Sequence, residues 1–281
     1  LSLLFVPPAE GGGMEINMGD YYYHYTSLKS LASILDTKSI LLNPLDTMDD
    51  IEDGKTGNFI YARKYVFCSS WTDQKDDLTL WSMYGEKMHG VCIGLCKKPF
   101  SLFEWDKDYM SGSKTIIPKG QYYLPPEDAL GREYTIAVSF NNMFFQEVKY
   151  SDNLNELYPD VLNWKNNNRA LEIDMGKVGL FKHKLWEKQK EWRYRVVCFP
   201  INYKNMAKLD SQRNGVYNYM QKGVELPLSH IRLYISDKAF NTMQIIKGPK
   251  MSKNEEISLE RLLEKHDLSQ NVISSQLHMR A

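Results

Sequence analysis

The sequence has little that would bind a metal ion. Its 281 residues include only four cysteines, and no two of them form a C-x-x-C pair. His89, Cys92 and Cys96 lie close together, but the run HGVCIGLC alternates like a strand and places successive side chains on opposite faces. We therefore expect no metal site, and we interpret the thiols, with those of Cys68 and Cys198, as free side chains in a reducing cytoplasm.

Long apolar runs and an excess of one charge are also missing. No run of about 18 apolar residues occurs, so the sequence predicts no membrane-spanning helix and no membrane partner. The 35 basic and 35 acidic side chains cancel, which gives no overall field for nucleic acid but leaves room for a local basic patch. Residues 1–20 lack the basic start and the long apolar run of a signal peptide. We interpret them as a flexible leader or an expression remnant, and we expect one domain over residues 21–281.

Aromatic side chains with polar tips are abundant instead. The chain has 18 tyrosines and 6 tryptophans, and such amphipathic rings suit a ligand cleft or an interface. The densest stretch is YYYHYTS, residues 21–27, where four tyrosines surround His24. A buried strand would carry Val, Ile or Leu at such positions. The stretch therefore indicates a strand that lines a cleft, although a histidine there can also be a hydrogen-bonded structural residue.

The hydrophobic periodicity predicts one mixed α+β domain. Strand and helix patterns alternate over the first hundred residues, with a capped helix that Gly85 ends. Residues 97–147 are less regular and are interpreted as an insertion or lid. We expect helices over 157–175 and 255–266, and a helix from residue 180 that leads into the strand WRYRVVCF, residues 192–199.

Two further segments carry candidate site residues. In LWSMYG, Trp81 and Tyr84 are three apart and share a helix face, which is also the pattern of core packing. In QKEWRYR, a strand would point Gln189, Glu191 and Arg193 to one side. Such a polar row is also typical of an ordinary protein surface.

Together the three segments suggest a pocket with an imidazole, a phenol and a carboxylate. The phenol of Tyr84 offers a π face to a pyridinium ring, and the imidazole of His24 donates a hydrogen bond to a ribose hydroxyl or a carboxamide. The carboxylate of Glu191 stabilises positive charge on a sugar as the ring leaves, as carboxylates do in glycoside cleavage. This is the chemistry of breaking the nicotinamide–ribose bond of NAD.

The order HYTSL, CSSW, DDLTLWSMYG, GVCIGL resembles a widespread bacterial domain family of unknown function over roughly Tyr21–Arg280. That family in turn resembles ADP-ribosyltransferases of the diphtheria-toxin type, whose histidine, tyrosine and glutamate fall here on His24, Tyr84 and Glu191. The chain departs from the pattern twice. Its MDDIEDG segment has no Asn-Asp-Pro turn, and Gln189 stands where E-x-E has its first glutamate, which leaves the acceptor open.

The resemblance implies an ADP-ribosyltransferase-like fold of two facing sheets, mixed or antiparallel, flanked by helices. It implies a mono-ADP-ribosyltransferase with NAD as co-substrate and no metal, by analogy a bacterial toxin or phage-defence effector that an antitoxin or inhibitor protein could bind. An NAD glycohydrolase and a non-catalytic binding module remain alternatives. The expected catalytic residues are Glu191 and Gln189. The expected NAD-binding residues are His24, Tyr25, Thr26, Trp81, Tyr84 and Arg193.

The acceptor is expected near Gln189, whose amide suits a guanidinium or a nucleobase edge. Positive charge interleaved with aromatic rings suits single-stranded nucleic acid, so we favour RNA or DNA slightly over protein. The alternative is a solvated helix face. The side chains concerned are Lys182, Lys184, Lys188 and Lys190, with His183 and Trp186 between them.

Overall fold

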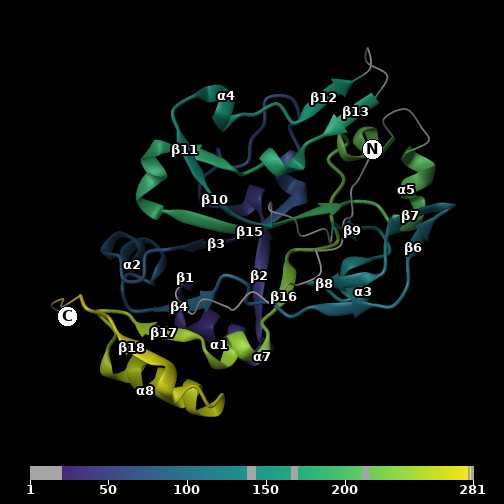
Figure 1. Ribbon diagram of the computed structural model, residues 1–281. Helices are drawn as coiled ribbons and strands as arrows, with labels where there is room; N and C mark the ends of the chain where they lie inside the picture. The colour runs from purple at the N-terminus through teal and green to yellow at the C-terminus, as the bar shows by residue number, and fades with distance from the viewer. Residues whose placement is uncertain (1–20, 138–143, 166–169, 211–214, 278, 280–281) are drawn as a thin grey trace.

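The computed structural model describes residues 21–137, 144–165, 170–210, 215–277 and 279. The leader expected over residues 1–20 lies outside the described residues. Within them the chain is a mixed α+β structure, as the periodicity predicts (Figure 1).

Ten strands of the described chain form one large sheet, in the order β10-β15-β3-β1-β4-β17-β18, with β2 paired to β3 and β16, and β9 paired to β15. Their bounds are β1 (Tyr21–Thr26), β2 (Ser39–Pro44), β3 (Val66–Thr72), β4 (Val91–Cys96), β9 (Thr135–Ile136), β10 (Phe145–Glu147), β15 (Glu191–Phe199), β16 (Ile231–Tyr234), β17 (Gln244–Lys247) and β18 (Val272–Ser274).

Smaller two-stranded ladders surround this sheet. They pair β5 (Phe103–Trp105) with β8 (Gly120–Tyr122), β6 (Tyr109–Ser111) with β7 (Lys114–Ile117), β11 (Lys149–Ser151) with β14 (Phe181–His183), and β12 (Leu162–Lys165) with β13 (Ala170–Ile173). The α-helices are α1 (Leu28–Thr37), α2 (Leu78–Tyr84), α3 (Pro126–Ala129), α4 (Leu154–Leu157), α5 (Tyr203–Asp210), α6 (Gly215–Met220), α7 (Asp237–Asn241) and α8 (Lys253–Lys265). The 3₁₀ turns are η1 (Leu45–Thr47), η2 (Ala62–Tyr65), η3 (Met175–Lys177), η4 (Lys184–Gln189) and η5 (Ser269–Asn271).

Side-chain caps explain where the two helices beside the site begin. Ser27 accepts a hydrogen bond from the backbone N–H of Ser30 and starts α1 directly after β1. Asp77 accepts from the backbone N–H groups of Thr79 and Leu80 and starts α2. Gly85 ends α2, as the sequence predicts. These caps therefore fix the residues at which α1 and α2 begin.

The large sheet is divided where β1 meets β3. β1 pairs with β4 along its whole length, but in the described strands it pairs with β3 only where Tyr23 lies opposite Thr72. β3 pairs instead with β15 and β2. The expected pair of facing sheets is therefore one sheet with two parts, β1-β4-β17-β18 and β10-β15-β3 with its branches, joined by a single pairing.

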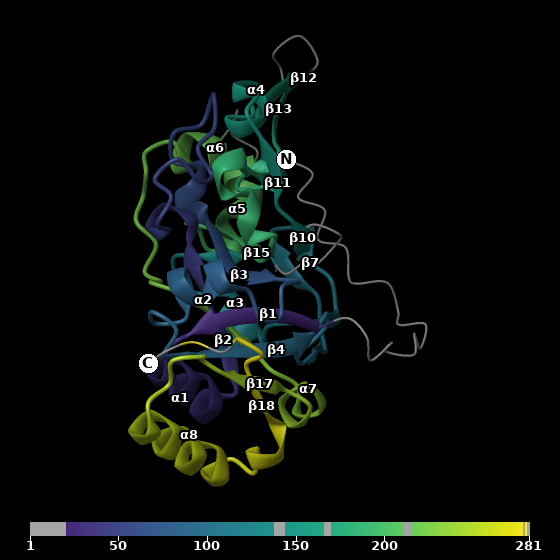
Figure 2. The same ribbon diagram turned by 90° about the vertical axis from the view of Figure 1, so that its left-hand side faces the viewer.

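Separate hydrophobic clusters pack against these parts. Leu31 of α1 and Leu259 of α8 are buried in the largest cluster, which extends to Tyr194 of β15. Tyr65 and Met220 belong to a second cluster, near the end that carries α4, β12 and β13 (Figure 2). Tyr25 and Trp81 pack in a third between β1 and α2. The region around the β1–β3 junction thus has a packed cluster on each side to hold it.

Two helix predictions were wrong: the helix over residues 157–175, and the helix from residue 180, where the structure has strand β14 and the 3₁₀ turn η4. Residues 157–175 form no single helix, because β12 and β13 pair as antiparallel strands there; residues 166–169 lie outside the described part. Residues 97–147 were predicted as an insertion or lid, and the structure describes all of them except residues 138–143. Trp105, Ile117 and Tyr122 of this segment are fully buried in the largest cluster, so the described part of the segment supports the core instead.

Candidate functional site

A pocket opens where β1 and β3 separate. Residues 23–25 of β1 and 70–72 of β3 line it, with side chains from α2, η4, the start of β15 and the loop after η1. Its empty volume, including the open space at its mouth, is about 670 Å³. The pocket therefore joins the three sequence segments from which a ligand site is expected.

Glu191 lies buried at the base of this pocket, at the first position of β15, with 4% of its surface exposed. Its Oε1 accepts a hydrogen bond from Nε of Arg193 at 2.5 Å, and its Oε2 accepts from Nζ of Lys182 at 3.1 Å. Burial alone would raise the pKa of Glu191, but Arg193 and Lys182 outweigh it and hold the pKa at about 2. The carboxylate is therefore ionised at every physiological pH.

Arg193 is the residue that holds this carboxylate in place. As predicted, it lies on the same strand face as Glu191, two residues along β15. Its remaining donors reach both carboxylate oxygens of Asp53 and the carbonyl of Gly179. Because these contacts direct the guanidinium to protein groups, Arg193 lines the pocket as a positioning residue for Glu191 rather than as a ligand-binding arm.

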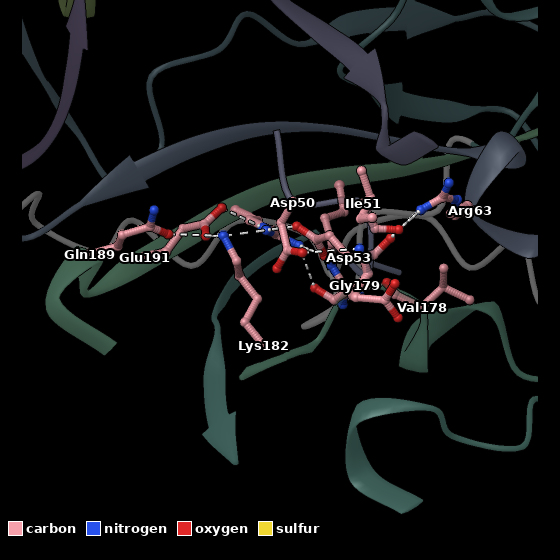
Figure 3. A network of polar contacts seen from close by, with 12 residues as sticks. Asp50, Ile51, Asp53, Arg63, Val178, Gly179, Lys182, Gln189 and Glu191 are labelled. Atoms are coloured by element: carbon pink, nitrogen blue, oxygen red, sulfur yellow. Dashed lines mark hydrogen bonds and ion pairs between the residues drawn. The ribbon is translucent and has the colours of Figure 1, made fainter. Parts of the chain in front are cut away.

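Gln189 reaches the site by a different route from the predicted strand face. It ends η4 rather than lying on β15, and Lys190 between it and Glu191 is left-handed, with φ 44°. This turn lets both flanking side chains meet Lys182, whose Nζ donates to Oε1 of Gln189 at 2.9 Å (Figure 3). Nε2 of Gln189 in turn donates to the Tyr84 hydroxyl at 2.6 Å.

Tyr84 and His24 stand on other walls of the pocket. Burial, followed by the charge of Glu191, raises the pKa of Tyr84 to about 12, so its hydroxyl stays protonated. Nδ1 of His24 lies 2.8 Å from the carbonyl oxygen of Ser70, which can only accept. Burial lowers the pKa of His24 below its usual range, so the ring is neutral at pH 7 and Nε2 carries the lone pair. In this protonation state Nε2 can accept but not donate a hydrogen bond, which differs from the donor role predicted for His24.

Three other residues expected to bind NAD have structural roles. The Tyr25 hydroxyl donates to the carbonyl of Gln74 and accepts from the backbone N–H of Asp77, so it anchors the start of α2 while lining the pocket. Trp81 is fully buried and donates from Nε1 to Asp76 at 2.6 Å. Thr26 is buried at the end of β1. Neither Trp81 nor Thr26 is among the described residues that line the pocket.

Sequence reasoning missed the two buried charges that complete the site. Asp53 comes from the acidic segment MDDIEDG, for which no buried residue was predicted, yet only 2% of it is exposed. Lys182 was expected on a basic surface, yet only 7% of it is exposed and its Nζ lies 4.7 Å from the centre of the Trp186 ring. The predicted basic surface therefore loses its first lysine, while Lys184 remains exposed beside Asp152.

The charges around the pocket favour a cationic guest. Four carboxylates line it against two cations: Asp49, Asp50, Asp53 and Glu191 against Lys182 and Arg193. Aromatic walls complete the lining, with Trp71 tilted against His24 at a ring distance of 5.3 Å. Acidic charge beside ring faces suits a planar cation.

Comparison with family models gives one match. Residues 80–194 are similar to the family described as "Protein of unknown function (DUF2971)". The matched segment carries Tyr84, Gln189 and Glu191 and begins after His24. Comparisons with curated proteins and with solved structures give no match. The chemistry of the pocket must therefore be argued from its own residues.

We searched the described residues for metal-binding groups and for helices that could cross a membrane. The described residues contain no group of three or more His, Cys, Asp and Glu side chains placed to hold a metal ion. No described helix has both the length and the apolar character needed to cross a bilayer.

Proposed function

We propose that the protein is a mono-ADP-ribosyltransferase that cleaves the nicotinamide–ribose bond of NAD and transfers ADP-ribose to a macromolecule. One observation carries the proposal. A buried carboxylate, Glu191, is held ionised in the same pocket as the neutral imidazole of His24 and the phenol of Tyr84. An ionised carboxylate in a buried pocket stabilises a developing oxocarbenium ion far better than one in water.

The reaction balances without a base. The C1′–N bond breaks, and nicotinamide leaves with its electron pair as a neutral molecule. A lone pair of the acceptor forms the new bond to C1′, and the acceptor loses a proton. Because the pKa of Glu191 is about 2, its carboxylate does not keep this proton, which passes to solvent. Glu191 thus acts as a fixed negative charge beside the sugar.

The other groups would bind and orient the dinucleotide. Nε2 of His24 can accept a hydrogen bond from a ribose hydroxyl or from the carboxamide N–H₂ of nicotinamide. Tyr84 and Trp71 offer ring surfaces to the pyridinium. The carboxylates of Asp49 and Asp50, on the loop after η1, add negative potential to the pocket.

The division of the large sheet supports the ADP-ribosyltransferase-like fold that we propose. Two sheet parts that meet at one pairing, between Tyr23 and Thr72, leave a cleft between them. Such a cleft suits an extended dinucleotide, with its reactive end at Glu191. By analogy with such enzymes we propose a cytoplasmic toxin or phage-defence effector, which an antitoxin or inhibitor protein could control.

Transfer and hydrolysis are separated by one labelling experiment. The protein is incubated with NAD labelled in its adenylate half, with mixed-sequence single-stranded RNA or DNA, or with protein. Nicotinamide release together with label on a macromolecule supports the transferase. Release with label only in free ADP-ribose supports the alternative, an NAD glycohydrolase. No release by the folded protein would refute NAD cleavage and leave a non-catalytic binding module.

The acceptor has its own test. If it is a nucleic acid, transfer falls as salt rises, because phosphate contacts release counterions. Label on protein alone, or transfer indifferent to salt, would contradict a nucleic-acid acceptor while leaving NAD cleavage intact.

A further inference from the structure

We infer that Lys182 permanently fills a cation site beside Glu191, so that the acceptor of ADP-ribose is not a guanidinium group but one that offers a lone pair to Gln189. The inference rests on the proposed ADP-ribosyl transfer and narrows its acceptor class. It assigns Lys182 as a positioning residue that also sets specificity.

The surroundings of Lys182 are those of a built cation site. Its Nζ lies 3.1 Å from Oε2 of Glu191, 2.9 Å from Oε1 of Gln189 and 4.0 Å from Oδ2 of Asp53. The ring of Trp186 closes another side. Figure 3 shows the ammonium group directed between Gln189 and Glu191 and the acidic loop of Asp50 and Asp53. Two carboxylates, an amide oxygen and an aromatic face would suit a guanidinium equally well, but the lysine of the chain already occupies the place.

Lys182 also fixes the orientation of the Gln189 amide, that is, where its oxygen and its nitrogen point. An ammonium group can only donate, so the amide atom beside it must be the oxygen. The amide nitrogen then points toward Tyr84, to which it donates one hydrogen. Among the described residues no second acceptor is found for this nitrogen, so we infer that its other N–H is available to an incoming group. That N–H can hold a hydroxyl, a carbonyl or a nucleobase ring nitrogen, whereas a guanidinium has no acceptor to give it.

The positive charge of Lys182 also disfavours a guanidinium acceptor. A cationic acceptor that approaches Glu191 and Gln189 meets the positive charge of Lys182 at hydrogen-bond range. Changing Gln189 to glutamate should not by itself admit a guanidinium, because Lys182 lies 2.9 Å from that position and would pair with the new carboxylate. Only a variant that lacks both the charge of Lys182 and the amide of Gln189 should accept a guanidinium group.

The inference is tested with agmatine, a small guanidinium acceptor, in four proteins: the parent, Lys182→Met, Gln189→Glu and the double variant. Transfer to agmatine is expressed relative to nicotinamide release. We expect the same low transfer from the parent, Lys182→Met and Gln189→Glu, and about tenfold more or higher from the double variant, as follows from removing a like charge at close range. Lys188→Met is the matched control, because Lys188 is exposed on η4, and it should behave as the parent.

Agmatine labelling by the parent or by Gln189→Glu at the rate of nicotinamide release would overturn the inference. So would a folded double variant that releases nicotinamide but still rejects agmatine. If Lys182→Met does not fold, agmatine labelling by the parent or by Gln189→Glu would still overturn the inference.

A second readout does not depend on catalysis. Titration calorimetry should show agmatine binding about tenfold tighter to the double variant than to the parent. Equal affinity would refute the cation site. If no protein releases nicotinamide, the proposed function fails, but this binding comparison still decides the role of Lys182.

Discussion

Replacement of Glu191 by glutamine is the sharpest test of the proposed chemistry. The change keeps the shape of the side chain and one carbonyl oxygen, but it removes the negative charge that both Arg193 and Lys182 contact at hydrogen-bond distance. The charge that would face the oxocarbenium ion disappears with it. Loss of one such group typically lowers the rate by about 100-fold or more. NAD affinity should change little, because most of the pocket lining is untouched.

Stability must be followed in the same variant. The pKa of Glu191 is about 2 in the folded protein and near 4.5 otherwise, so its charge contributes about 3 kcal/mol of stability at neutral pH. Arg193 keeps Asp53 as a partner in the variant, which limits the loss. The assay should therefore be run well below the melting temperature, with folding checked by circular dichroism.

Nicotinamide release at saturating NAD is the measurement, with NAD affinity taken from calorimetry. Glu187→Gln is the matched control, because Glu187 is exposed on η4 and does not line the pocket. It should keep parental activity. A folded Glu191→Gln protein that releases nicotinamide at the parental rate would refute the assignment of Glu191 and the reaction argued from it.

Three further predictions follow from the same contacts. His24→Ala and Tyr84→Ala should each weaken NAD binding by roughly 1–3 kcal/mol without unfolding the chain, and calorimetry showing unchanged affinity would make both residues structural. Asp53→Asn should destabilise the fold by about 3–5 kcal/mol in urea unfolding, because it leaves the buried Arg193 short of a counterion; a loss below about 1 kcal/mol would contradict this. The ionised Glu191 makes its whole contribution to the free energy of unfolding above a pH of about 4.5, and this contribution declines as the pH falls toward about 2. The difference in unfolding free energy between the parent and Glu191→Gln should therefore shrink over that pH range. A difference that stays constant would show that Glu191 is not ionised in the fold.

Local signals were enough to predict the elements around β1 and α2. Ser27 and Asp77 cap the helices that follow them, and Gly85 ends α2. These features act within a few residues, so periodicity and cap chemistry find them without the fold. The same reasoning failed at residues 157–175, where helical and strand periods were confused and the pairing of β12 with β13 decided the outcome.

Convergence of His24, Tyr84 and Glu191 on one pocket agrees with the site that the sequence suggested, although their roles stay predictions. The position of Trp81 shows the limit of that reasoning. Residues three apart share a helix face, but here one of them packs in a core cluster and the other lines the pocket. Trp81 is fully buried and donates to the half-buried Asp76, whereas Tyr84, one turn later, lines the pocket.

The missed residues are those whose partners lie far away in sequence. Arg193 and Glu191 are two residues apart and lie on the same buried face of β15. A buried guanidinium requires carboxylate partners. The sequence could therefore have indicated that one aspartate of the acidic loop lies inside. It could not show which one, because that depends on how the loop turns.

Glycine explains why the partner is Asp53. Gly54 follows it with φ +70°, and a Cβ there would lie 3.0 Å from Leu45 Cδ1 and 3.1 Å from Arg63 Cβ. Gly179, also at φ +70°, gives its carbonyl to Arg193, and a Cβ there would lie 2.6 Å from the same Leu45 atom. The two left-handed turns thus pack against the same leucine, next to the ion pair of Asp53 and Arg193. Asp53 is aimed inward by the tight turn that only its neighbour can make, and the charge of the site depends on two glycines that carry no chemistry themselves.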